Sequence, residues 1–346
     1  MTRIAVATSS GLIIAQGRNG DWHAVEHLQG NDVQALAVDP LRPAIMYCGT
    51  FGQGLWRSDD AGGTWQPVGA GIAHPQVMSI AVSALERFGD AGVVYAGTEP
   101  SALFRSTDGG ATWRECAALR ALPSAPTWSF PPRPYTSHIR CIALDPREPG
   151  VLALCIEAGA LVRSTDAGET WTDRVPSGPW DTHTLLVHPN APGRFYAAAG
   201  DGFMRPGAGY AESRDAGASW WRHGEGLRQH YLWGAAVDPA DPDTVIVSAA
   251  NSPNQAHNPS AAESFVYRRS GDGWRESGDG LPSGRGMLAA VLATNAAEPG
   301  VFYAAANTGV YRSADAGRSW SPLPIPWPDA NRSRHVNAFV VTEPDD

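Results

Sequence analysis

Histidine and arginine side chains recur at one kind of position in this sequence. Half of the ten histidines stand at the start of a short apolar segment or just before it. They are His74, His138, His183, His230 and His335. Arg140, Arg285 and Arg334 hold similar positions. Imidazoles exchange protons near neutral pH and bind metal ions, and guanidinium groups pair with carboxylates. If the segments converge in space, these side chains would form one polar binding site.

The apolar segments that carry these residues share a length and a pattern. Each is typical of a short β-strand, and several end in Asp-Pro. They read VQALAVDP (33–40), VMSIAVSA (77–84), IRCIALDP (139–146), THTLLVHP (182–189), LWGAAVDP (232–239), MLAAVLAT (287–294) and VNAFVVTE (336–343). Further strand-like segments follow each of them, so we expect seven repeated units of four short strands. The 38 glycines, 28 prolines and 13 tryptophans also favour short strands over long helices.

A turn motif, S-x-D-x-G-x-[TS]-W, occurs once in most of these units. Full matches lie at 58–65, 106–113, 164–171, 213–220 and 313–320, with a shortened form at 270–274 and a vestige at 20–22. The Asp can accept hydrogen bonds from the backbone of its own turn, and the Gly can adopt a positive φ. The Trp can bury a large apolar area against the sheet. We therefore interpret these Asp residues as structural and not catalytic.

This motif resembles the Asp-box, or BNR, repeat of β-propellers. The resemblance predicts an all-β, seven-bladed β-propeller with Asp-box repeats that fills residues 1–346 as a single domain. The segment 336–342 has no strands after it, and the chain begins with second-strand and third-strand patterns at 4–8 and 12–16. We expect these segments to join in the seventh blade, so that the C-terminal strand closes the ring.

The resemblance extends along nearly the whole chain to a superfamily with several functions. It includes sialidases, two-propeller xyloglucanases, sortilin-type receptor domains and photosystem II assembly factors of the Ycf48 type. An Arg-Ile-Pro signature, which the sialidase pattern implies, is absent from the sequence. A two-propeller enzyme would need about twice the 346 residues of this chain. The resemblance therefore implies a scaffold, and function has to be argued from the site.

In a propeller of this kind the first strands line a central channel, and the site is predicted at the face where they start. Three long insertions, 118–138, 201–211 and 251–263, are expected on the same face. The predicted catalytic residues are His138, His183, Arg140 and His335. The predicted substrate-binding residues are Arg285, Trp233, Tyr231, Trp128, Tyr210 and Arg334, with Trp128 in an aromatic wall or lid on the Pro-rich insertion.

Three interpretations of this cluster stay open. In the first, His138, His183 and His335, joined by Glu157, bind one divalent metal ion that activates water or a carbonyl. In the second, a histidine transfers protons without a metal while an arginine binds a carboxylate. In the third, the cluster is a hydrated channel mouth or a protein-docking face.

The leading hypothesis is a small-molecule-binding propeller, a hydrolase or lyase acting on a polar anionic or glycan-like substrate. The alternative is a non-catalytic assembly propeller of the Ycf48 type with a protein partner. The net charge of −9 and the absence of Lys/Arg runs argue against nucleic acid and anionic membranes as partners. The N-terminal segment lacks the pattern of a secretion signal, which predicts a cytoplasmic protein.

Overall fold

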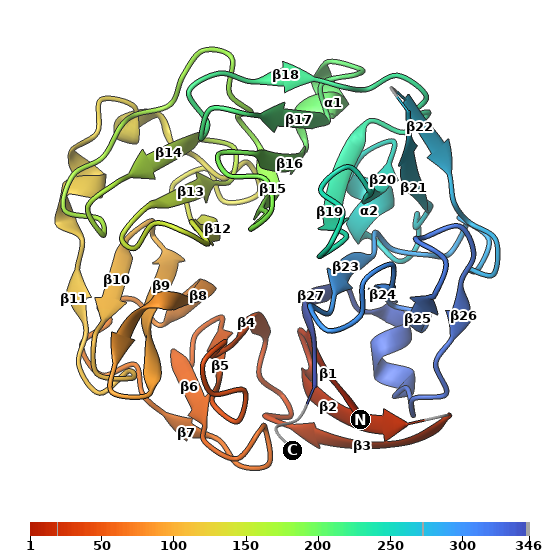
Figure 1. Cartoon of the computed structure of the whole chain (residues 1–346), viewed down its shortest axis with the longest axis horizontal. Helices are drawn as coiled ribbons and strands as arrows, with labels where there is room; N and C mark the ends of the chain where they lie inside the picture. The colour runs from red at the N-terminus through yellow and green to blue at the C-terminus, as the bar shows by residue number, and fades with distance from the viewer. Residues whose placement is uncertain (19, 272, 344–346) are drawn as a thin grey trace.

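A ring of small antiparallel sheets makes up the protein. The computed structural model describes residues 1–18, 20–271 and 273–343. Within these residues, seven sheets stand around a central axis (Figure 1). The prediction of an all-β, seven-bladed propeller is confirmed. Helical segments are short, as in α1 (Asp201–Met204) and α2 (Pro253–His257). In the part of the chain described, no helix has the length and apolar character needed to cross a membrane.

The inner strand of each blade lies beside the axis and corresponds to one of the repeated apolar segments. These strands are β4 (Val33–Val38), β8 (Gln76–Phe88), β12 (Ile139–Leu144), β15 (Thr182–Val187), β19 (Tyr231–Val237), β23 (Val291–Thr294) and β27 (Val336–Thr342). The second strands are β5 (Met46–Thr50), β9 (Ala91–Glu99), β13 (Leu152–Ile156), β16 (Phe195–Ala199), β20 (Val245–Ala250), β24 (Phe302–Ala306) and β1 (Thr2–Thr8).

The outer part of each blade is made by a third strand and, in most blades, a short fourth strand. The third strands are β6 (Leu55–Ser58), β10 (Leu103–Ser106), β14 (Ala160–Ser164), β17 (Tyr210–Ser213), β21 (Ser264–Ser270), β25 (Gly309–Ser313) and β2 (Gly11–Arg18). The fourth strands are β7 (Gln66–Pro67), β11 (Arg114–Glu115), β18 (Trp221–Arg222), β22 (Gly273–Glu276), β26 (Ser321–Pro322) and β3 (Asp21–His27). In the third blade a single bridge between Arg163 and Thr172 replaces this strand.

Neighbouring blades pack through small and aromatic side chains, because both faces of each second strand are covered. All residues of β16 and β24, which both read FYAAA, are buried. Arginines that follow the third-strand apolar residues add polar contacts between blades. Arg57 Nη1 donates to the Gly109 carbonyl at 2.6 Å, and Arg163 Nη1 donates to the Ala216 carbonyl at 2.6 Å.

The five turns at 58–65, 106–113, 164–171, 213–220 and 313–320, here called the Asp turns, connect third to fourth strands or their equivalents. In the first of them Asp60 Oδ1 accepts from Ser58 Oγ and from the Thr64 amide, each at 2.8 Å. Trp65 Nε1 closes the turn on the Gly62 carbonyl at 3.1 Å. The residue after the Asp also has a positive φ, 63° at Ala61, so the turn needs two successive left-handed residues where the sequence indicated one glycine. The shortened turn at 270–274 contains residue 272, which lies outside the described residues.

The ring is closed as predicted. β27 pairs antiparallel with β1, with Ile4 opposite Val341 and Val6 opposite Phe339. The C-terminal strand thus supplies the inner edge of a blade whose other strands come from the N-terminus (Figure 1).

Candidate functional site

A cavity of about 590 Å³ opens where the inner strands begin. Its wall combines residues at the starts of inner strands, such as Asp32, Tyr231 and His335, with residues of two insertions, such as Phe130 and His257. The Asp turns lie at the other end of the inner strands in every blade that has one. The order of the strands therefore places the Asp turns on one face of the propeller and the cavity on the opposite face.

Bulges in the inner strands help to aim side chains at this cavity. The pairing register between inner and second strands shifts near the start of β4, β8, β12, β15, β19 and β27. The unpaired residues are Gln34, Met78, Arg140, His183, Asn337 and, on β19, one of Trp233 and Gly234. A bulge re-aims the side chain it carries. Most of these side chains line the cavity, and His183 lies just behind its wall.

His138 lies between two carboxylates and is only 2% exposed. Its Nε2 is 2.9 Å from Glu157 Oε2, and its Nδ1 is 3.3 Å from Glu99 Oε2. Burial lowers the pKa of His138, but the charge and hydrogen bond of Glu157 and the contact with Glu99 outweigh burial and raise it. The two carboxylates therefore favour the protonated form of His138, in which the ring pairs with both of them.

Glu99 is also paired on its other side. Arg133 Nε and Nη2 donate to its two oxygens at 2.7 and 2.6 Å. Burial would raise the pKa of Glu99, but the hydrogen bonds from Arg133 and His138 lower it to about 2. The Arg133 guanidinium also lies 4.8 Å from the ring centre of Phe130. This pair fixes the Pro-rich insertion over one side of the cavity.

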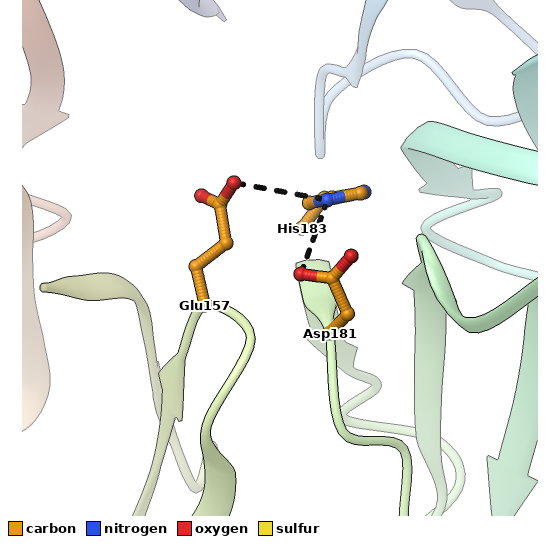
Figure 2. A group of neighbouring side chains, drawn as sticks. All are labelled: Glu157, Asp181 and His183. Carbon is orange, nitrogen blue, oxygen red and sulfur yellow. Dashed lines mark ion pairs between the residues drawn. The ribbon is translucent and has the colours of Figure 1, made fainter. Parts of the chain in front are cut away.

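Glu157, Asp181 and His183 form a cluster whose ligand atoms lie within 4.8 Å of one another (Figure 2). His183 Nε2 is 3.6 Å from Asp181 Oδ1 and 3.9 Å from Glu157 Oε1. On the other side of the ring, Nδ1 is 2.6 Å from the Leu232 carbonyl. Because a carbonyl only accepts, Nδ1 carries a proton, so Nε2 is the ring nitrogen that could bind a metal ion beside the two carboxylates.

The two carboxylates of the cluster differ in their surroundings. Burial would raise the pKa of Glu157, but His138, His183 and Arg140 hold it well below its usual range. Burial raises the pKa of Asp181, since the attraction of His183 is opposed by the charges of Glu157 and Asp201. Asp181 Oδ1 also accepts from the Ala158 amide at 3.0 Å. Environments that separate two carboxyl pKa values in this way are common at acid–base sites.

A group of aromatic and imidazole rings stands beside the cluster. Tyr231 Oη lies 3.0 Å from His257 Nε2 and 3.4 Å from His183 Nε2. The His257 and His335 ring centres are 4.7 Å apart, and Trp233 packs edge-on to both. Burial lowers the pKa of His335 to about 3 and lowers that of His257 well below its usual range. Both rings are therefore neutral at physiological pH.

The structure brings together most of the residues predicted for catalysis and metal binding. The cavity is lined by His138, Arg140, Trp233, Tyr231, Glu157 and His335. His183 lies outside the wall, with Nε2 3.9 Å from Glu157 Oε1. The four residues predicted to bind one metal ion do not all come together. Glu157 and His183 form a cluster with Asp181, whereas His138 pairs with Glu99 and Glu157. His335 packs against Trp233 and His257 on another wall, outside the cluster.

Four residues predicted for substrate binding lie away from the cavity wall. Trp128 packs in a hydrophobic cluster and donates to Ser124 Oγ at 3.0 Å, because the insertion turns its indole inward. Tyr210 is fully buried between blades, where its hydroxyl donates to Glu212 at 2.9 Å. Arg285 and Arg334 are exposed. Both precede the repeated segments in sequence, but neither is among the residues that line the cavity.

Other members of the site were not among the predicted catalytic, substrate-binding or metal-binding residues. Asp181 directly precedes a repeated segment, but its meeting with Glu157 depends on the loop between β13 and β14. His257 lies in the insertion 251–263, which α2 turns back over the cavity. Glu99 and Arg133 come from two different loops, so the spacing of residues in the sequence does not predict that they pair.

No family model matches the sequence, and no curated protein matches it. Among solved structures, the chain is similar to a GH74 enzyme of Niastella koreensis, with 20% identity and a TM-score of 0.69. That match covers 92% of this chain and 51% of the enzyme, so the chain spans about half of the enzyme's length. The likeness is one of fold.

The chain is also similar to two YCF48 structures. For YCF48 bound to D1 peptide the identity is 15% and the TM-score 0.64, with 96% of this chain and 99% of that chain covered. For YCF48 from Cyanidioschyzon merolae the identity is 12% and the TM-score 0.54, with 84% and 85% covered. At such identities the propeller is shared, and the chemistry has to come from the site.

Proposed function

We propose that the protein is an enzyme of the hydrolase or lyase class that acts on a small polar substrate in the cavity. One divalent metal ion, held by Glu157, Asp181 and His183, would assist the reaction. The observation that carries this proposal is the orientation of His183. Its Nδ1 is fixed by the Leu232 carbonyl, and its Nε2 faces two carboxylates at 3.6 and 3.9 Å.

The charges around the cluster support a cation there. In the described residues, the carboxylates of Asp32, Glu99, Glu157 and Asp181 surround the site, whereas the nearby cations are Arg133, His138 and Arg140. Arg133 and His138 already pair with Glu99 and Glu157. A divalent cation would relieve the repulsion between Glu157 and Asp181 and engage the lone pair of His183.

The residues around the cluster suggest how a reaction would proceed. Held by this imidazole and the two carboxylates, a metal ion would act as a Lewis acid toward water or a substrate oxygen. Tyr231 holds a proton on Oη beside the cluster, within hydrogen-bond distance of His257. The neutral His257 can accept that proton or orient it toward a leaving group. Hydrolysis and elimination both need such a pair of groups.

Elemental analysis tests the metal site directly. We expect the purified protein, after equilibration with Zn²⁺ or Mn²⁺ and desalting, to retain one equivalent of metal. Asp181→Asn and His183→Gln should each weaken binding by about tenfold or more, because each removes one ligand. Asp32→Asn is the matched control, since Asp32 lines the same cavity outside the cluster. Protein that retains no metal would exclude metal assistance and leave Asp181 as the proton carrier of a metal-free enzyme.

A second candidate function, recognition of a protein partner, is favoured by one surface observation. Exposed apolar side chains lie in the segments before β15 and after β16, at the end of the blade where β15 begins, with Trp180 45% exposed, Phe203 49% and Met204 79%. YCF48, whose fold is shared over nearly its whole length, is seen bound to a peptide. A Phe203→Ser/Met204→Ser variant should then lose a partner that the wild type and Asp181→Asn both retain in pull-downs. Retention of that partner by the surface variant would argue against this function.

A further inference from the structure

We infer that the ligand of the cavity is a small monocarboxylate whose anionic group pairs with the guanidinium of Arg140. This inference rests on the proposed function in that the same cavity binds the substrate, and it specifies the chemical class of that substrate. It concerns a different group from the metal cluster. The two can therefore be tested separately.

Of the two arginines in the described cavity wall, Arg140 is the one whose guanidinium makes no hydrogen bond, although it lies within ion-pair distance of Glu157. No hydrogen bond joins its guanidinium to any residue in the described ranges, and its Nε is buried without a partner. The nearest carboxylate oxygen, Glu157 Oε2, is 3.8 Å from Nε and is already bound by His138 at 2.9 Å. The Arg140 side chain is nevertheless only 12% exposed. Burying a cation without hydrogen bonds lowers the stability of the folded protein unless a ligand supplies the missing acceptors.

The guanidinium of Arg140 is also held in place. It stacks on Trp233, with 4.4 Å between Cζ and the ring centre, and Trp233 is fixed by its contacts with His257 and His335. Arg133 provides the contrast within the same wall, because Glu99 already takes two of its hydrogen bonds. A planar, oriented guanidinium with free donors is the usual partner of a carboxylate.

A second polar atom near Arg140 is unused. Nε2 of His335 is buried and makes no hydrogen bond of normal geometry. Arg140 and His335 both pack against Trp233, with 4.4 Å from the Arg140 Cζ and 5.0 Å from the His335 ring centre to the Trp233 ring centre, and both line the cavity. A neutral imidazole at this position can donate to the second oxygen of a carboxylate or accept from a neighbouring hydroxyl.

The charge and shape of the cavity select the class of anion. One free guanidinium beside the carboxylates of Glu157, Asp181 and Asp32 matches one negative charge, whereas a dianion such as phosphate would be repelled by these groups. Met78, Phe130 and Pro253 give the rest of the wall an apolar character. With a volume of about 590 Å³, the cavity fits a carboxylate attached to a ring-sized body.

The test compares charged and neutral ligands of the same shape. Thermal unfolding and calorimetric titration are measured with benzoate against benzamide, with glucuronate against glucose, and with formate and inorganic phosphate. The protein is used in two states, loaded with metal and treated with a chelator. Arg140→Gln and Arg140→Lys are the test variants, and the Lys variant keeps the charge should the Gln variant fold poorly. Arg334→Gln and Arg285→Gln are the controls, since both arginines are exposed and neither lines the cavity.

We expect at least one carboxylate to raise the unfolding temperature while its neutral counterpart and phosphate do not. Arg140→Gln and Arg140→Lys should weaken that ligand by about tenfold or more, because each loses a charge-assisted, bidentate contact. Arg334→Gln and Arg285→Gln should bind as the wild type does.

Three results would overturn the inference. They are the failure of every carboxylate to bind in either state, equal binding of charged and neutral partners, and wild-type affinity in both Arg140 variants. The proposed function fails separately, because it depends on metal content. Carboxylate binding that persists in chelated protein and in Asp181→Asn supports the Arg140 subsite whether or not a metal ion is found.

Discussion

At the scale of single residues, His138 serves first as a counter-ion. It is 2% exposed, and its two ring nitrogens face Glu157 and Glu99 at 2.9 and 3.3 Å. Both nitrogens of this ring lie beside carboxylates, Nε2 in a hydrogen bond with Glu157 and Nδ1 at ion-pair distance from Glu99, so we expect neither to abstract a substrate proton. Its contribution to catalysis would therefore be indirect, through the charge and position of Glu157.

The counter-ion role of His138 predicts a large effect on stability. Replacing it by Gln leaves two buried carboxylates without their shared cation, so the free energy of unfolding should fall by about 3–5 kcal/mol. Urea-induced unfolding measures this change. His138→Gln combined with Glu99→Gln should recover part of the loss, because one of the two charges is then gone. A loss no larger than that of an exposed ion pair, below about 1 kcal/mol, would contradict the assignment.

The sequence predicted six of the residues that line the cavity, but it did not predict how most of these side chains pair. His138, His183, Arg140 and Trp233 were found because they begin repeated strands, and that position is set by the local pattern. Whether two side chains meet depends on loops and bulges that the pattern does not contain. Asp181 joins Glu157 across a blade boundary, and Trp128 turns into a core where its indole finds Ser124.

At the scale of elements, the Asp turns combine a local clasp with a charge. Asp60, Asp215 and Asp315 each accept backbone and side-chain hydrogen bonds within their own turn, and these bonds hold their pKa values at about 2. The carboxylates are exposed, so each contribution is small. Because the turn recurs from blade to blade, the effect is repeated around the ring.

These low pKa values predict how stability depends on acid. A carboxyl group whose pKa is about 2 in the folded protein and 3.8, its ordinary value, in the unfolded chain binds more protons in the unfolded state. Its contribution is complete above pH 3.8 and is lost as the pH falls toward about 2. The variant Asp60→Asn/Asp215→Asn/Asp315→Asn should therefore lose stability at neutral pH and show a flatter acid dependence in this window.

Unfolding monitored by circular dichroism at several pH values measures this dependence. Asp59→Asn is the matched control, because Asp59 neighbours Asp60 but bonds the side chains of Arg57 and Gln66 instead of the turn backbone. An acid profile that is the same in the triple variant and in the wild type would show that the turns do not depend on their charge.

At the scale of the whole molecule, the two ends of the chain meet in one blade. β27 pairs with β1 over the length of both strands, so opening this blade would expose strand edges on both sides. The architecture was predictable from sequence because a repeat fixes the number of blades and the leftover segments fix how they close. The cavity was less predictable, because it depends on six bulges and two insertions that interrupt the repeat.

Circular permutation isolates the contribution of this closure. Joining the original ends and opening the chain at Asn31, between β3 and β4, leaves every blade made from one continuous segment. Opening it at Gly89, between β8 and β9, preserves a split blade of the same kind. We expect the Asn31 permutant to unfold faster and at lower urea concentration than the Gly89 permutant, since it alone lacks a split blade. Equal stability of the two permutants would show that the closure adds nothing.

The line along which the ring closes also runs through the cavity wall. His335 and Asn337 belong to the C-terminal strand, whereas Asp32 and Gln34 follow the N-terminal strands, and Asn337 Nδ2 reaches across to Asp32 and to the Val33 carbonyl. A ligand that contacts residues of both groups would hold the C-terminal strand against the N-terminal part of the chain. Occupancy of the cavity and closure of the ring are then thermodynamically linked, and each makes the other more favourable. A pair of fluorophores at the two chain ends would report substrate binding without contacting the substrate.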